Sequence, residues 1–144
     1  MGRVVMDTST LVGAMLRTKS KPRQALLAVV KSHVLCVSQS TLTELHVVLQ
    51  RSKFDRYAPL QTRLEFLDVV RQTAHLYEID TASEAASLSA CRDPKDDKFL
   101  ALAMACEAMV IISSDADLLS LQRWNNIAII SPADFLIIAK QPSA

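Results

Sequence analysis

Short apolar runs alternate along the chain with longer segments in which apolar residues recur at helical spacing. The apolar runs predict strands at 3–6, 34–38, 75–79, 109–113 and 127–131. The helical spacing predicts helices at 9–16, 22–31, 41–51, 60–73, 94–107, 116–121 and 132–140. Residues 80–92 fit a short helix, a loop or, in part, a strand. Because continuously apolar strands need cover on both faces, the pattern predicts a three-layer α/β/α domain with a doubly wound parallel sheet.

The composition fits a single domain that spans residues 1–144. Half of the residues are hydrophobic, which is enough for one sizeable core. The three cysteines, Cys36, Cys91 and Cys106, are odd in number and lack Cys-x-x-Cys spacing, so they favour neither a disulfide framework nor a zinc site. No apolar run approaches the membrane-spanning length of about 20 residues. We therefore expect a cytoplasmic protein that contacts no membrane, and the net charge of +1 excludes a strongly basic nucleic-acid coat.

Four carboxylates stand near the starts of predicted helices: Asp7, Glu44, Asp97 and Asp115. Asp7 and Asp115 closely follow predicted strands, and Glu44 lies in the helix after another strand. Since the carboxyl ends of parallel strands share one edge of a sheet, we expect these acids to converge there. Such a group repels itself without a cation, and oxygen ligands favour Mg²⁺ or Mn²⁺ over zinc. The sequence thus predicts a divalent metal site.

Helix capping offers a second interpretation of the same acids, because Asp, Ser and Thr are the usual N-cap residues. Residues 41–44 match the capping box Ser/Thr-x-x-Glu, in which Glu44 would bind a free backbone N–H. Asp93 followed by Pro94 is typical of an N-cap. Capping does not account for Asp97, which lies beyond that cap at the start of an apolar stripe where an unpaired carboxylate is costly.

The motifs at residues 5–9, 38–45, 91–103 and 112–119, with the closing segment 130–136, resemble a PIN domain. The most specific part of this resemblance is the stretch D-P-K-D-D-K-F-L-A-L-A at residues 93–103. The branch that the chain resembles most contains toxin components of prokaryotic toxin-antitoxin systems. The resemblance implies a Rossmann-like sheet of strand order 3-2-1-4-5, a Mg²⁺ or Mn²⁺ site and endoribonuclease activity, with an antitoxin as protein partner and a homodimer as the assembly.

The resemblance also implies roles for individual residues. Matched by position, the family's acidic quartet, which binds metal and carries catalysis, falls on Asp7, Glu44, Asp97 and Asp115. Ser113 occupies the family's usual Thr or Ser position, and Ser9 replaces the common Asn. Both hydroxyls are expected to support the metal site by orienting a carboxylate or a water. In phosphodiester hydrolysis, a divalent ion supplies a nucleophile at neutral pH and neutralises charge in the transition state.

A basic segment separates the first two predicted helices. Four of the seven residues at 17–23 are basic, and all four are candidate RNA contacts: Arg17, Lys19, Lys21 and Arg23. An ordinary solvated loop explains the same composition. A weaker basic cluster follows at Arg51, Lys53 and Arg56.

Three other classes fit the pattern less well. A receiver-like signalling module needs an acidic pair near the first strand and a Lys after the fifth, where this chain has one Asp and Ser131-Pro132. A haloacid-dehalogenase-like phosphatase needs Asp-x-Asp after the first strand, and residues 7–9 lack the second Asp. A catalytically inactive PIN-like scaffold would have lost one of the four acids, and all four are present.

Overall fold

The computed structural model describes residues 2–140, which are organised around one six-stranded sheet in the order β3-β2-β1-β4-β6-β5. The strands are β1 (Arg3–Met6), β2 (Val34–Val37), β3 (His75–Leu76), β4 (Val110–Ile112), β5 (Arg123–Trp124) and β6 (Ile127–Ile130). The strand pairs are parallel except for β5 with β6. The five predicted strands take the predicted order, and β5 is an extra edge strand.

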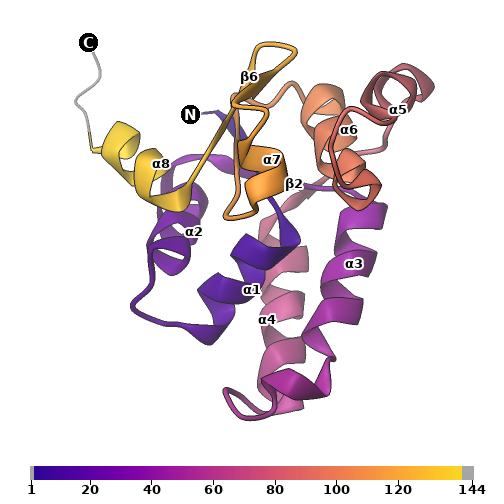
Figure 1. The fold of residues 1–144 in the computed structure, drawn as a ribbon. Helices are drawn as coiled ribbons and strands as arrows, with labels where there is room; N and C mark the ends of the chain where they lie inside the picture. The colour runs from indigo at the N-terminus through magenta and orange to yellow at the C-terminus, as the bar shows by residue number, and fades with distance from the viewer. Residues whose placement is uncertain (1, 141–144) are drawn as a thin grey trace.

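Helices cover both faces of this sheet (Figure 1). They are α1 (Thr8–Leu16), α2 (Lys21–Ser32), α3 (Gln39–Leu49), α4 (Leu60–Thr73), α5 (Thr81–Ser87), α6 (Asp97–Ala105), α7 (Ala116–Leu119) and α8 (Pro132–Ala139). Val4 and Met6 of β1 pack in a core with α1 to α4 and α8, whereas Val5 packs in a second core with α6 and α7. Successive residues of an apolar strand thus enter opposite cores, which confirms the predicted three-layer α/β/α fold.

Several element boundaries differ from the predicted ones. The strand predicted at 75–79 has only two residues, and residues 80–92 contain the short helix α5. The helix predicted at 94–107 is divided into a 3₁₀ turn, η2 (Pro94–Asp96), and α6. The unpredicted β5 pairs with β6 across Asn125 and Asn126, whose φ angles of 48° and 65° suit a two-residue hairpin turn.

The start of α3 corrects the predicted capping box. Ser38 is the N-cap: its hydroxyl accepts the backbone N–H of Thr41, and the Thr41 hydroxyl accepts the backbone N–H of Ser38. The box therefore begins three residues before the one predicted at 41–44, because Ser38 directly follows β2. Glu44 lies in the second turn of α3, where its carboxylate is free for other contacts.

The register of the central strands determines which residues meet at the carboxyl edge of the sheet. Met6 of β1 is paired with Ile112 of β4, so the residues that follow them, Asp7 and Ser113, are neighbours in space. Among residues 2–140, no helix is both long enough and apolar enough to cross a membrane.

Candidate active site

Asp7 is buried at the end of β1, where three groups fix its carboxylate. Its Oδ1 accepts the backbone N–H of Thr10 at 3.0 Å, which makes Asp7 the N-cap of α1. Its Oδ2 accepts the hydroxyls of Ser113 at 2.6 Å and Ser9 at 3.3 Å. Burial raises the pKa of Asp7, and these hydrogen bonds oppose the increase. The capping interpretation is thus correct for Asp7, but it does not account for the two hydroxyls on Oδ2.

Ser113 also connects Asp7 to Asp115. While its hydroxyl donates to Asp7, the same oxygen accepts the backbone N–H of Asp115 at 2.9 Å. Asp115 stands at the N-cap position of α7, yet its side chain makes no capping hydrogen bond. The carboxylate of Asp115 therefore faces the space in front of Asp7 instead of closing the helix, and it lines the same cavity.

Glu44 reaches this region from α3. Its Oε2 accepts the hydroxyl of Thr8 at 2.7 Å, and its Oε1 lies 3.4 Å from Nζ of Lys98. Thr8 follows Asp7 directly, so this hydrogen bond ties Glu44 to the end of β1. The contacts explain why Glu44 faces the sheet edge, and they leave the capping interpretation of this residue without support.

Asp97 is the one predicted acid that the structure does not bring to this group. Its Oδ2 accepts the backbone N–H of Ser89 at 2.8 Å and its Oδ1 that of Cys91 at 3.0 Å. The side chain is buried and holds the loop between α5 and η2. Because successive residues at the start of a helix point about 100° apart, Asp96 faces the other acids when Asp97 faces this loop.

Asp7, Glu44, Asp96 and Asp115 border one cavity of about 240 Å³, which we call the acidic cavity. Its other lining residues are Thr8, Ser9, Val48, Arg51, Asp93 and Phe99. Burial, a hydrogen bond shared with Asp115 and repulsion from Asp115, Asp93 and Asp7 raise the pKa of Asp96 to about 8. The carboxyl groups of the cavity are thus too close together and too buried for all of them to ionise readily at neutral pH.

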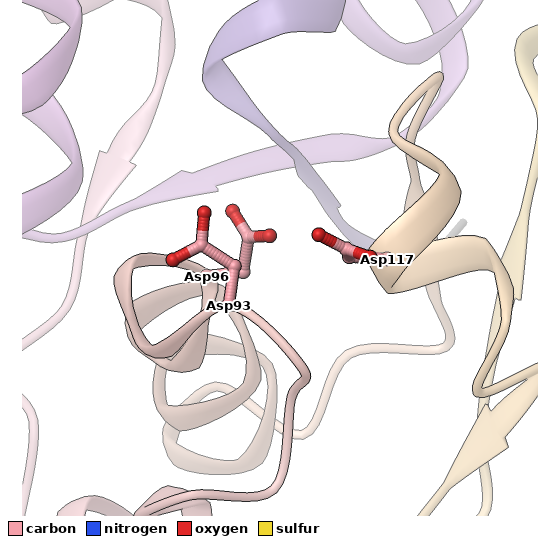
Figure 2. Close-up of side chains that lie close together, drawn as sticks. All are labelled: Asp93, Asp96 and Asp117. Atoms are coloured by element: carbon pink, nitrogen blue, oxygen red, sulfur yellow. The ribbon is translucent and has the colours of Figure 1, made fainter.

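Three aspartates lie close together, and two of them, Asp93 and Asp96, line this cavity (Figure 2). Asp93, Asp96 and Asp117 each offer an oxygen within 4.8 Å of the others, close enough to hold a metal ion. Asp93 is the N-cap of η2 and Asp96 is its last residue, whereas Asp117 comes from α7 and also pairs with Arg92 at 3.1 Å. Asp96 and Asp117 are not among the predicted site residues, and the hydrogen bond from the N–H of Lys95 confirms the predicted role of Asp93 as an N-cap.

The acidic cavity suits a hard divalent cation. Carboxylate and hydroxyl oxygens dominate its polar lining, and the described lining residues include neither histidine nor cysteine, the ligands that select zinc. A cation would remove the repulsion that raises the pKa of Asp96. The arrangement therefore fits a divalent metal with oxygen ligands.

The basic residues of the predicted segment lie in different surroundings. Arg23 donates from Nε to the carbonyl of Ala14 at 2.6 Å, a contact that joins α2 to α1. Lys19 and Lys21 are exposed and border none of the described cavities near the acids. Arg17 lines a cleft that adjoins the acidic cavity, so it is the one basic residue of this segment placed beside the site.

The comparison with protein families identifies the domain. A family model described as PIN domain matches residues 3–117, which include every acid of the cavity. The chain belongs to the PIN domain family. This confirms the resemblance that the acidic motifs carried. No curated protein sequence is similar enough to the chain to count as a match.

Solved structures of PIN-like fold support the assignment. A chain in the DNA-bound VapBC of Salmonella typhimurium is 16% identical, with 92% of this chain and 99% of that chain covered at a TM-score of 0.66. A chain in VapBC2 of Rickettsia felis, bound to a promoter DNA fragment, is 14% identical, with 90% of this chain and 98% of that chain covered at a TM-score of 0.67. VapC20 of Mycobacterium tuberculosis, described as a Sarcin-Ricin loop cleaving toxin, is 11% identical, with 87% of this chain and 98% of that chain covered at a TM-score of 0.57. At these identities the likeness concerns the fold.

Proposed function

We propose that this PIN domain is a metal-dependent endoribonuclease that acts as the toxin of a toxin-antitoxin pair. The observation that carries the proposal is the acidic cavity, in which Asp7, Glu44, Asp96 and Asp115 border one space and the pKa of Asp96 is raised to about 8. A cluster of carboxylates with perturbed pKa values at the carboxyl edge of a parallel sheet is typical of a catalytic site.

Asp7, Asp96 and Asp115 would hold the metal, with Asp93 and Asp117 close enough to contribute. Mg²⁺ or Mn²⁺ fits this donor set, and when bound it supplies charge neutralisation and an activated water for phosphodiester hydrolysis. Ser113 and Ser9 orient the carboxylate of Asp7 through their hydrogen bonds. Thr8 and Lys98 orient Glu44. In this proposal Glu44 would accept a proton from a water at the metal site.

The solved structures support the toxin part of the proposal. Two of the similar chains come from VapBC assemblies bound to DNA, and a third is described as a toxin that cleaves the Sarcin-Ricin loop. By analogy we assign this protein RNA as its substrate, a cognate antitoxin as its partner, a homodimer as its assembly and the cytoplasm as its place of action. A small protein encoded next to this gene should copurify with the chain and inhibit it.

Incubation of the purified protein with total RNA and tRNA in Mg²⁺, Mn²⁺ or EDTA tests the activity. Wild type should cleave RNA only with metal and leave 5′-phosphate ends, whereas a contaminating ribonuclease that uses the ribose 2′-hydroxyl leaves 2′,3′-cyclic phosphates. Asp7→Asn should abolish cleavage, because it removes a charge from the metal-binding group. Asp134→Asn, which changes an exposed aspartate on α8, is the matched control and should cleave normally. Cleavage by Asp7→Asn at the wild-type rate would refute the assignment.

A further inference from the structure

A second cleft, of about 410 Å³, adjoins the acidic cavity. We call it the basic cleft, because its charged lining residues are Arg17, Arg51 and Lys53. Ser9, Val48 and Arg51 line both spaces, so the two adjoin one another. A nucleic-acid strand with one phosphate at the acidic cavity can therefore place a neighbouring nucleotide in the basic cleft.

The cations of the basic cleft are free to bind an anion. Arg17, Arg51 and Lys53 are exposed, and within residues 2–140 none of them forms a salt bridge with a carboxylate. Lys53 instead lies over the ring of Phe54, with Nζ 5.2 Å from the ring centroid. Three unpaired cations beside a cluster of acids give the surface two regions of opposite charge. This is the pattern that a phosphate backbone and a metal site require together.

Much of the wall of the basic cleft is apolar. Besides three serines, its uncharged lining consists of Val12, Leu16, Val48 and the half-buried ring of Phe54, together with Gly13 and Pro22. Apolar and aromatic side chains next to cations suit a ribose and base, because a base stacks on a ring while its phosphate meets the charge. A base that enters such a cleft has left its helical stack, which favours a single strand over a duplex.

A buried arginine fixes the segment that carries most of these groups. The guanidinium of Arg63 donates to the backbone carbonyls of Leu49, Arg51 and Ala58, and it pairs with the carboxylate of Asp55. Arg63 is fully buried in α4. These bonds hold the backbone between α3 and α4 in one conformation, so Arg51, Lys53 and Phe54 stand in the cleft as a preorganised set.

We propose that the basic cleft binds the nucleotide next to the scissile phosphate in single-stranded RNA. Arg51 contacts the phosphate shared by the two spaces, Arg17 and Lys53 contact the neighbouring phosphate, and Phe54 stacks on the base. The proposal rests on the proposed ribonuclease function, and it moves RNA recognition away from Lys19, Lys21 and Arg23. It identifies the substrate as an unpaired segment of RNA.

Binding of a fluorescent single-stranded RNA to the Asp7→Asn protein in Mg²⁺ tests the cleft without cleavage. The double variant Arg17→Ala/Lys53→Ala should weaken binding on the order of tenfold. It should also reduce the slope of log K against log salt by about 1.4, because each cation that no longer neutralises a phosphate accounts for about 0.7. Lys31→Ala/Lys140→Ala removes the same charge at the opposite edge of the sheet and should change affinity less than threefold. Equal decreases in affinity in the two doubles would overturn the proposal.

Two further comparisons separate the parts of the proposal. Phe54→Leu keeps an apolar side chain but removes the stacking ring, so it should weaken binding roughly fivefold or more. A duplex of the same sequence should bind more weakly than the single strand. Tighter duplex binding, or a larger decrease in affinity in Lys19→Ala/Lys21→Ala than in Arg17→Ala/Lys53→Ala, would overturn the cleft as the binding site.

Cleavage by the otherwise wild-type protein distinguishes failure of this proposal from failure of the proposed function. A protein that cleaves RNA with metal but binds it equally well in both doubles is a ribonuclease without this subsite. The other case is a protein that cleaves no RNA under any metal condition while RNA binding is weakened only by Arg17→Ala/Lys53→Ala. In that case it binds RNA in the cleft but is no ribonuclease.

Discussion

Replacement of Asp96 or of Asp97 by asparagine should change stability in opposite directions, although the two residues are adjacent. Each carboxylate oxygen of Asp97 accepts one backbone N–H, from Ser89 and from Cys91. An asparagine amide offers one acceptor, so one of the two hydrogen bonds disappears and the NH₂ group faces an N–H donor. Ser89 also has a φ of 58°, a conformation that costs a non-glycine residue about 1–2 kcal/mol and that the bond to Asp97 stabilises.

The magnitude follows from these bonds. A hydrogen bond to a charged group contributes about 1.5–3 kcal/mol, so Asp97→Asn should lower the free energy of unfolding by roughly 2–3 kcal/mol. For a chain of this size, each kcal/mol changes the melting temperature by about 3 °C, which gives a decrease of about 6–9 °C. Because the pKa of Asp96 is about 8, its side chain is mostly neutral at pH 7.5, and a neutral asparagine at this position should melt no lower than wild type in EDTA.

Thermal melts with and without metal test the same pair for ligand binding. Mg²⁺ or Mn²⁺ at a hundredfold excess over its dissociation constant stabilises the folded protein by about 2.7 kcal/mol, or about 8 °C. Asp97→Asn should show the same metal-dependent increase in melting temperature, although it melts lower than wild type without metal. Asp96→Asn should lose most of this increase. If Asp97→Asn lost the increase and Asp96→Asn kept it, the carboxylate of Asp97 would be the ligand and the assignment drawn from the structure would be wrong.

Three other predictions concern stability, catalysis and pH. Arg63→Met should lower the free energy of unfolding, measured in urea, by roughly 3–5 kcal/mol, because it leaves backbone carbonyls without their donor. Asp55→Asn changes the exposed partner of Arg63 and should lower it by about 1 kcal/mol or less, so equal decreases would contradict this account. Glu44→Gln should reduce cleavage roughly a hundredfold while stability in EDTA holds, and normal cleavage would exclude Glu44 from catalysis. In EDTA the folded protein keeps a proton on Asp96 up to about pH 8, whereas the unfolded chain releases this proton near pH 4. The free energy of unfolding should therefore fall as the pH rises from about 4 to about 8, and the decrease should be smaller in Asp96→Asn.

The parts of this protein that the sequence predicts well depend on patterns several residues long. The strands are continuously apolar, and their order follows the family that the acidic motifs indicate. Asp7 and Asp115 could be placed at the sheet edge because each closely follows such a strand. Their position needs no exact helix boundary.

The choice between Asp96 and Asp97 as the acid that faces the cavity does require an exact helix boundary. The two acids straddle the change from η2 to α6, and a displacement of one residue there exchanges the carboxylate that faces the cavity with the one that faces the loop. Asp117 was missed because it approaches Asp93 and Asp96 only through the fold. The role of Arg63 was equally hidden, since a single arginine in an amphipathic helix has the pattern of a solvated residue.

The hydrogen bond between Ser113 and Asp7 joins residues separated by 106 positions in the chain. The chain is synthesised from its N-terminus, so Asp7, Glu44 and Asp96 are all made before β4 exists to pair with β1. No nascent chain shorter than about 115 residues contains the assembled acidic cavity. The order of the polypeptide therefore delays assembly of the acidic cavity until most of the protein has been made.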